Sequence, residues 1–360
     1  MNMKICFFSL SSRDILIKKE IELITGPDLH HKLLSDTLIA LCEEVEYITY
    51  SDNGFHEKLK DKTRIIMTYN ENNSINIIKK VILINKAIRN SKSNLIYYSG
   101  GANGLVIFLS KINRKKTIFN VSSDNDVTLD FFKTPILSIK NFLDILFTDE
   151  IIVQTNKQKS LIPKFFQNKI SLIKMPIEIT EEYNVANKNN QVIWVGSINR
   201  VKRPDLYINL SDHLSDIDFV LIGGMGSDNE YNKYIMKLLE NHQNIKYKGY
   251  LPKEEVKNEL SISKLLINTS EYEGFPHVFL EAWNFKVPAL TINIDPDGVI
   301  SQNKAGIVCD DYNELISNLN LLIKNHDMRS NMGENGYHYL INHHKYDIKK
   351  YLKIFRKYTN

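Results

Sequence analysis

Two glutamates eight positions apart, Glu273 and Glu281, stand in the stretch from Ser270 to Trp283, which reads SEYEGFPHVFLEAW. The short apolar run at 265–268 before this stretch predicts a buried strand. Pro276 has a fixed φ that suits the first turn of a helix, so a tight turn must join the strand to the helix. Glu273 then stands in the turn and Glu281 about one turn inside the helix, where one ligand could meet both carboxylates.

The start of this expected helix suits a phosphate group. Gly274 lets the backbone approach a ligand closely, and the N–H groups of the first turn, near His277 and Val278, can bind an anion. A carboxylate accepts two hydrogen bonds and therefore suits the vicinal hydroxyls of a ribose or hexose. These features predict a site for a phosphorylated sugar. The simpler alternative is that both glutamates are solvated helix charges and that Gly-Phe-Pro is an ordinary turn.

A second segment with suitable chemistry follows an apolar strand at 192–195. The strand breaks at Gly196, and Pro204 begins the next helix. Between them stand Arg200, Lys202 and Arg203. Cations beside a glycine turn and just before a helix suit a diphosphate, because backbone N–H groups orient it while lysine neutralises charge as a bond to phosphate breaks. The alternative is a basic loop exposed to solvent.

The first stretch resembles the signature of the family 4 retaining glycosyltransferases. In that signature a Glu, seven residues and a second Glu enclose Gly-Phe-Pro, here Gly274, Phe275 and Pro276, and the motif ends in Leu-Glu-Ala. The resemblance implies that Glu281 holds the ribose hydroxyls of a nucleotide sugar and that Glu273 contacts the donor sugar. It is strong from 191 to about 299 and looser before that.

The second segment also resembles this family, in which a Val-Gly turn precedes an Arg and a Lys that clamp the pyrophosphate. Lys202 falls at the position of the family lysine. Ser197 stands where the family has arginine, so Arg200 could supply the missing charge. The resemblance further implies that the turn containing Tyr250 and Leu251 seats the base.

Two positions in the first half of the chain are assigned with the help of the same resemblance. The family has a glycine-rich loop near the donor phosphate and the acceptor, and Gly26 is the one glycine kept here. His30 and His31 beside it could face the acceptor, or they could be ordinary surface or packing residues. Where the family presents a histidine or an acid near the reacting sugar, Asp124 is the nearest substitute. Together with Asp126 it also forms an Asp-x-Asp triplet, which in GT-A enzymes binds a divalent metal.

Strands and helices alternate along the chain, which predicts parallel sheets covered on both faces. With the resemblance, the expected fold is α/β GT-B, in which two Rossmann-like doubly wound parallel-sheet domains face each other across a cleft. We expect an acceptor-side domain at 1–183, a donor domain at 184–343, and a helix at 344–360 that crosses back to the first domain. The elements expected in the first domain are strands at 5–10, 45–50, 64–68, 95–98, 117–121, 150–153 and 170–173, and helices at 28–43 with Asp28 as N-cap, 75–89, 105–111 and 158–166.

Composition narrows the classes of function. The chain of 360 residues has 43% hydrophobic and 24% charged residues and a net charge of +4, which is too mild to indicate nucleic acid. No apolar run approaches 18 residues, so we expect a cytoplasmic protein. The segment 131–147 mixes aromatic residues and leucines with Lys133 and Lys140. It could be a peripheral helix touching the inner face of the membrane or a helix packed on the sheet.

The resemblance to family 4 implies a retaining glycosyltransferase that moves a sugar from a nucleoside-diphosphate sugar, with UDP favoured, to a glycan or lipid-linked glycan. Catalysis is expected to involve Glu273, Lys202 and Asp124, with no cofactor and no obligatory metal. Surface polysaccharide synthesis is the expected setting. The alternatives are a GT-B nucleotide-sugar epimerase, an inactive nucleotide-sugar binding module, and a metal-dependent GT-A enzyme.

Overall fold

The structure is a computed structural model that describes residues 3–12, 16, 26–41, 43–51, 55–60, 63–70, 75–101, 103–177, 179, 189–345 and 348–359. Contacts divide the chain into two compact units, residues 1–174 with 347–360, and residues 175–346. The predicted boundary at 183/184 lies nine residues after the first division, and the one at 343/344 lies three residues before the second. The expected linker at 184–190 lies mostly outside the described residues.

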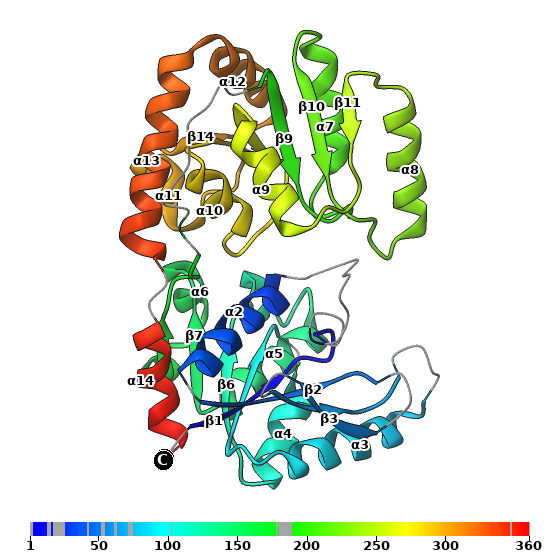
Figure 1. Ribbon diagram of the computed structural model, residues 1–360, viewed down its shortest axis with the longest axis vertical. Helices are drawn as coiled ribbons and strands as arrows, with labels where there is room; N and C mark the ends of the chain where they lie inside the picture. Colours follow the sequence, from blue (N-terminus) through cyan, green and yellow to red (C-terminus); the bar gives the residue numbers. More distant parts are fainter. Residues whose placement is uncertain are drawn as a thin grey trace. The chain divides into compact units, whose positions relative to one another are not determined.

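The first unit contains a mostly parallel sheet with helices on both faces (Figure 1). Its strands are β1 (Lys4–Phe8), β2 (Glu44–Thr49), β3 (His56–Lys60), β4 (Thr63–Met67), β5 (Leu95–Ser99), β6 (Lys116–Asn120), β7 (Glu150–Val153) and β8 (Ile170–Leu172). Its helices are α2 (Gly26–Ala40), α3 (Ile77–Asn90), α4 (Gly104–Ile112), α5 (Pro135–Phe147), α6 (Asn156–Leu161) and α14 (Ile348–Thr359), with 3-10 turns η1 (Asp124–Asp126) and η2 (Lys164–Lys169). The strand order is β3-β4-β2-β1-β5-β6-β7-β8, and only β3 runs antiparallel to its neighbour.

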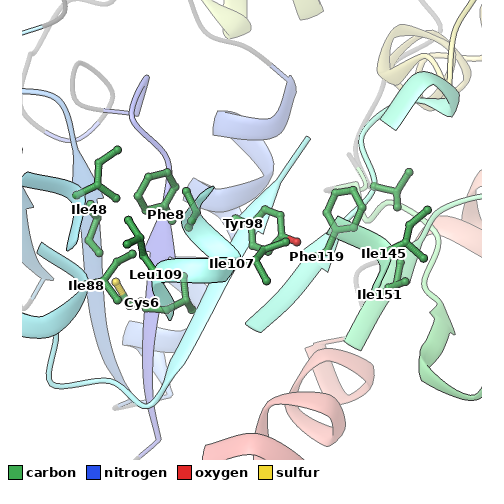
Figure 2. Packing of buried hydrophobic residues seen from close by; sticks show 14 of the residues in the cluster. Cys6, Phe8, Ile48, Ile88, Tyr98, Ile107, Leu109, Phe119, Ile145 and Ile151 are labelled. Atoms are coloured by element: carbon green, nitrogen blue, oxygen red, sulfur yellow. The ribbon is translucent and has the colours of Figure 1, made fainter. Parts of the chain in front are cut away.

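Alternate residues of the central strands point to opposite faces of this sheet, because side chains in a strand repeat every second residue. On one face Cys6, Tyr98 and Phe119 pack with residues of α3, α4 and α5, and the rings of Tyr98 and Phe119 stack at 5.2 Å (Figure 2). On the other face Phe7 and Tyr97 pack with residues of α2 and α14. The helix expected to return to the first domain is therefore α14, which is part of the core of this unit.

The second unit has a six-stranded, all-parallel sheet in the order β11-β10-β9-β12-β13-β14. These strands are β9 (Gln191–Val195), β10 (Asp218–Ile222), β11 (Ile245–Tyr247), β12 (Leu265–Asn268), β13 (Ala289–Ile292) and β14 (Gly306–Cys309). The helices are α7 (Pro204–Leu210), α8 (Asn229–Glu240), α9 (Lys253–Ile262), α10 (His277–Asn284), α11 (Val299–Asn303), α12 (Tyr312–Lys324) and α13 (His326–His344), with 3-10 turns η3 (Ser211–His213) and η4 (Pro296–Gly298). This is the doubly wound order in which the chain reverses direction across the sheet between β9 and β12.

The helix α10 is fixed by close packing against α13. Trp283 of α10 is fully buried and donates from Nε1 to the carbonyl oxygen of Ala305 at 3.1 Å. Gly336 of α13 faces this indole, and a Cβ at that position would come within 2.3 Å of the ring. The glycine allows the two helices to approach closely. Because α10 is rigidly packed, the residues at its start are held in one place.

Two expectations for the first unit were wrong, and one strand had not been expected. Asp28 does not cap a helix at 28, because α2 already begins at Gly26; instead its buried carboxylate accepts hydrogen bonds from the hydroxyls of Ser9, Ser11 and Ser12. The expected helix at 158–166 ends at Leu161, because a proline follows two residues later. The edge strand β3 was not expected at all, since its sequence HEKLK is mostly charged.

His30 and His31 are core residues rather than exposed ones. His30 Nε2 lies 3.0 Å from the Tyr351 hydroxyl and His31 Nε2 lies 2.7 Å from the Ser99 hydroxyl. Burial lowers the pKa of His30 to about 4 and the pKa of His31 to about 3. Both rings are therefore neutral at pH 7, and the packing interpretation holds for both.

Candidate functional site

The predicted donor residues of the second unit gather where its strand order reverses. The segment 196–203 follows β9 and the segment 269–276 follows β12, and these two strands are neighbours in the sheet. Ligands of open α/β sheets bind beyond the carboxyl ends of the strands at such a switch point. The sheet topology therefore brings together two loops that are about seventy residues apart in sequence.

Thr269 joins these two loops. Its hydroxyl oxygen accepts a hydrogen bond from Trp194 Nε1 at 3.0 Å and lies 2.9 Å and 2.7 Å from the carbonyl oxygens of Lys202 and Arg203. The backbone N–H of Glu271 adds a 2.7 Å bond to the carbonyl of Val201. Thr269 is 2% exposed, so these bonds are shielded from water. The sequence analysis missed this residue, because a threonine after a strand carries no distinctive signal.

The loops bring Lys202 and Glu273 into an ion pair between Nζ and Oε1. The Ser270 hydroxyl donates a second hydrogen bond to the same carboxylate oxygen at 2.8 Å. The side chains are 28% and 13% exposed, so the pair is partly shielded but open to a ligand. Two residues predicted from separate motifs are thus in direct contact, and each limits the positions that the other can take.

Glu281 lies in α10 and is half-buried. Its carboxylate makes neither a hydrogen bond nor an ion pair in the described part of the chain. Burial raises the pKa of Glu281, while the charges of Lys253 and Lys257 on α9 act in the opposite direction. The structure therefore contains a desolvated acceptor beside two cations, and a bound hydroxyl donor would relieve its desolvation.

The turn before α10 has the expected order of strand, turn and helix, although the helix begins at His277, one residue later than expected. Gly274, Phe275 and Pro276 are buried, and Phe275 is part of the hydrophobic core. His277 and Val278 are half-buried in the first turn. They stand at the N-terminal end of α10, where backbone N–H groups point out of a helix toward a bound anion.

The remaining predicted residues of the β9 loop differ in surroundings. Gly196 donates its N–H to the Ile222 carbonyl at 3.0 Å, and a Cβ on Gly223 would lie 1.7 Å from the Gly196 oxygen, so the backbones are in contact here. Ser197 is exposed. Arg200 is paired with Asp228, the N-cap of α8, at 2.8 Å, and its side chain is 64% exposed. Contact between Arg200 and a diphosphate remains a prediction.

Tyr250 and Leu251 lie in the turn between β11 and α9. The turn passes through Gly249, whose φ of 64° favours glycine. Burial raises the pKa of Tyr250, and Leu251 packs against the core residues that surround α10. Both side chains are half-buried, which fits an apolar seat for a base and equally fits ordinary packing.

Gly26 and Asp124 belong to the first unit. Gly26 is the first residue of α2. Asp124 opens η1 and pairs with Lys157 at 2.7 Å, whereas Asp126 accepts hydrogen bonds from the N–H groups of Ser122 and Ser123. Asp126 is thus engaged in its own turn, and the described residues contain no group of three His, Cys, Asp or Glu side chains that could hold a metal ion. This arrangement gives the GT-A interpretation no support.

Comparison with known families agrees with the geometry of the second unit. The family model described as glycosyl transferases group 1 matches residues 177–339. These residues are therefore similar in sequence to the glycosyl transferases group 1. The match covers almost all of the second unit and includes both loops of the switch point and the whole of α10.

Individual relatives are distant. An uncharacterized glycosyltransferase of Haemophilus influenzae is 24% identical over 208 residues, which cover 55% of this chain and 58% of that protein. The amylovoran biosynthesis glycosyltransferase AmsD of Erwinia amylovora is 24% identical over 240 residues, which cover 63% of this chain and 67% of AmsD. The matches thus span about three-fifths to two-thirds of these relatives.

Solved structures establish the fold. The crystal structure of Anabaena HepE in complex with UDP and glucose superposes with a TM-score of 0.76 over 99% of both chains at 14% identity. The architecture is GT-B, with two Rossmann-like units built on parallel sheets, as the sequence predicted.

Proposed function

We propose that the protein transfers a sugar from a nucleoside-diphosphate sugar to a glycan or lipid-linked glycan, with retention of anomeric configuration. The observation that carries this proposal is the Lys202–Glu273 pair at the switch point of a unit that matches the group 1 glycosyltransferase model. Glu281, whose carboxylate has no hydrogen bond or ion pair in the described part of the chain, lies in the helix that follows. UDP is the favoured nucleotide, supported by the UDP bound in the Anabaena structure. The AmsD relative supports a setting in polysaccharide synthesis.

In this proposal Lys202 stabilises the departing diphosphate. Negative charge grows on the phosphate oxygens as the glycosidic bond to the sugar breaks, and an ammonium group already in position lowers the barrier without costly reorganisation. The first-turn N–H groups of α10 add hydrogen bonds to the same phosphates. The Lys202–Glu273 ion pair holds the ammonium near this location before the donor arrives.

Glu273 and Glu281 then fix the two ends of the donor. Glu273 shares one carboxylate oxygen with Lys202 and Ser270, so its other oxygen is the one offered to a sugar hydroxyl. Glu281 accepts both ribose hydroxyls, and two bonds to one carboxylate define the orientation of the ribose. Holding the donor at both ends keeps the reacting carbon in one position for attack.

The first unit is proposed to bind the acceptor, with Asp124 as its contact to the reacting sugar and Gly26 near the donor phosphate. We also propose that transfer takes place in the cytoplasm at the inner face of the membrane, where a lipid-linked acceptor would be reached. Neither a cofactor nor a metal ion has a role in this proposal.

The test is thermal unfolding with UDP, GDP and ADP in the presence of a chelator. A nucleotide at one hundred times its dissociation constant adds about 2.7 kcal/mol to the stability of the unit that binds it. We expect one nucleotide, UDP, to raise the midpoint. Binding without turnover of any donor would favour an inactive binding module, and isomerisation of the donor without acceptor would favour an epimerase.

A further inference from the structure

Three of the four buried residues of helix α5 are polar, the fourth being Ile145 in the core, and most of its other apolar residues are exposed. Ser138, Asn141 and Asp144 are fully buried, whereas Ile136 is 71% and Ile139 is 52% exposed. A helix that only covers a sheet shows the opposite pattern, with its apolar stripe facing the core. The outward apolar stripe of α5 therefore needs a reason other than the packing of this unit.

The buried polar side chains of α5 have a structural role of their own. Asp144 accepts a 2.9 Å hydrogen bond from the backbone N–H of Asn103, and Asn141 donates to the carbonyl oxygens of Asn125 and Thr128 at 2.6 Å and 3.2 Å. These bonds tie α5 to the loops before α4 and after η1. The inner face is thus explained by loop anchoring, which leaves the outer face without a partner inside this unit.

The neighbouring helix α4 continues the exposed apolar surface. Leu105, Phe108 and Ile112 are spaced by three and four residues, so they form one stripe, and they are 41%, 59% and 58% exposed. The helices α3, α4 and α5 all pack on the same face of the sheet. An Asn113 to Asn85 hydrogen bond of 2.7 Å joins the end of α4 to α3.

On α3, Ile78 and Ile82 are 64% and 59% exposed, and in the loop before α5 Phe132 is completely exposed. Of the 21 large apolar side chains that are exposed in the described residues, 13 lie between 77 and 147. Monomeric proteins seldom expose apolar side chains in such a cluster unless it binds something. We call the exposed apolar residues of α3, the 131–132 loop, α4 and α5 the apolar face.

The charges around the apolar face are mostly basic, although Asp130 stands beside Phe131 and Phe132. From 75 to 116 the sequence has nine basic residues and no acidic residue. Lys79 and Arg89 are exposed on α3, and Lys133 and Lys140 are exposed on and before α5. The only acid within α3, α4 and α5 is the buried Asp144. Exposed apolar side chains surrounded by cations complement a bilayer whose surface carries anionic phospholipid.

We propose that the apolar face docks on an anionic phospholipid bilayer, with Phe108 and Phe132 inserted among the lipids and Lys79 and Lys140 at the phosphate level. No helix in the described residues is both long and apolar enough to span a membrane, so this contact would be peripheral. Lysine side chains suit this position because their stems cover apolar surface while the ammonium reaches the headgroups. The inference deepens the proposed function, because it names the surface at which a lipid-linked acceptor would be met.

Vesicle flotation of the full chain tests this proposal without reference to catalysis. The vesicles contain phosphatidylglycerol and phosphatidylcholine in equal parts, or phosphatidylcholine alone. We expect binding to the anionic vesicles and much weaker binding to the neutral ones. Binding should also weaken at about 1 M salt, where charge interactions are screened beyond about 3 Å.

Substitutions test whether vesicle binding depends on the apolar face or on any exposed apolar residue. Phe108→Glu combined with Phe132→Glu should lower the partition coefficient at least tenfold, since each phenyl ring no longer enters the bilayer. Lys79→Gln and Lys140→Gln should each lower it about fivefold on anionic vesicles only. The matched control, Tyr234→Glu with Leu321→Glu, removes side chains of the second unit that are 47% and 45% exposed and should leave binding unchanged.

Two outcomes would overturn the proposal. One is a failure of the wild-type chain to bind anionic vesicles. If the chain instead self-associates through the apolar face, the wild type would be oligomeric and the phenylalanine variant monomeric, and the proposal would be overturned in the same way. The other is vesicle binding that is equally strong in the phenylalanine, lysine and control variants. The lysine variants keep the test decisive if the phenylalanine variant does not fold. Neither outcome bears on the donor site, because nucleotide binding is measured separately.

Discussion

Removing the carboxylate of Glu281 should abolish most nucleotide binding while leaving the second unit folded. Burial raises the pKa of Glu281, so its unfolded form ionises more readily than its folded form. As pH rises through the unfolded and then the folded pKa, this group therefore lowers the free energy of unfolding. The carboxylate has no protein partner to lose in the described residues. We thus expect Glu281→Ala without ligand to unfold at the wild-type temperature or slightly above it.

With ligand the same substitution should be costly. Two charge-assisted hydrogen bonds to the ribose contribute about 2–4 kcal/mol, which corresponds to a dissociation constant raised about 30- to 700-fold. If UDP is present at one hundred times the wild-type constant, a hundredfold loss reduces the stabilisation from about 2.7 to about 0.4 kcal/mol. For a unit of this size the midpoint shift falls from about 5–10 °C to about 1–2 °C.

The assay is differential scanning fluorimetry with and without UDP, followed by titration calorimetry. Glu281→Gln keeps one acceptor oxygen without the charge and should give an intermediate loss. Glu240→Ala removes an exposed acid at the end of α8 and serves as the control. An undiminished UDP shift in Glu281→Ala would refute the ribose role, and a large loss of stability without ligand would show that the residue is structural.

Three further predictions follow from the same geometry. Lys202→Met should lower kcat about 10²- to 10³-fold in a donor-turnover assay, because it removes the charge that faces the leaving group; a change confined to KM would argue against this role. Thr269→Val leaves the Trp194 N–H and two carbonyl groups without a shared hydroxyl and should lower the free energy of unfolding by about 1–3 kcal/mol in urea titration; no change would mean that water replaces the hydroxyl. His30 and His31 have folded pKa values of about 4 and about 3, below the unfolded value. Their contribution to the free energy of unfolding is therefore fully present above pH 6.5 and is lost as the pH falls toward the folded values. At pH 5 each histidine should lower the free energy of unfolding by about 2 kcal/mol relative to pH 7. Equal urea midpoints at the two pH values would contradict this.

Elements with a strong local signal were predicted to within a residue or two. The strands at 150–153 and 265–268 have the expected bounds, since each is a short buried apolar run. Elements that depend on distant partners were not predicted. The charged strand β3 exists because it pairs with β4, and no apolar alternation marks it in the sequence.

The donor site was predicted residue by residue only where a motif was present. The resemblance gave Lys202 and Glu273 as separate contacts, but their mutual ion pair depends on β9 and β12 being neighbours in the sheet. Thr269 and the lysines of α9 were missed for the same reason, since their roles arise from tertiary contacts. The sequence left both alternatives for 131–147 open, because leucine and isoleucine occur on both faces of that helix.

The central claim is that the switch point of the second unit binds and activates a nucleotide sugar. It is tested most directly by UDP release from a panel of UDP-sugars in chelator, in the presence of a membrane extract as acceptor source. We predict release by the wild type and release slower by about 10²-fold in Glu273→Gln, where the Lys202 pair is lost. Equal release by the variant, or none from UDP-, GDP- or ADP-sugars by the folded wild type, would contradict the account.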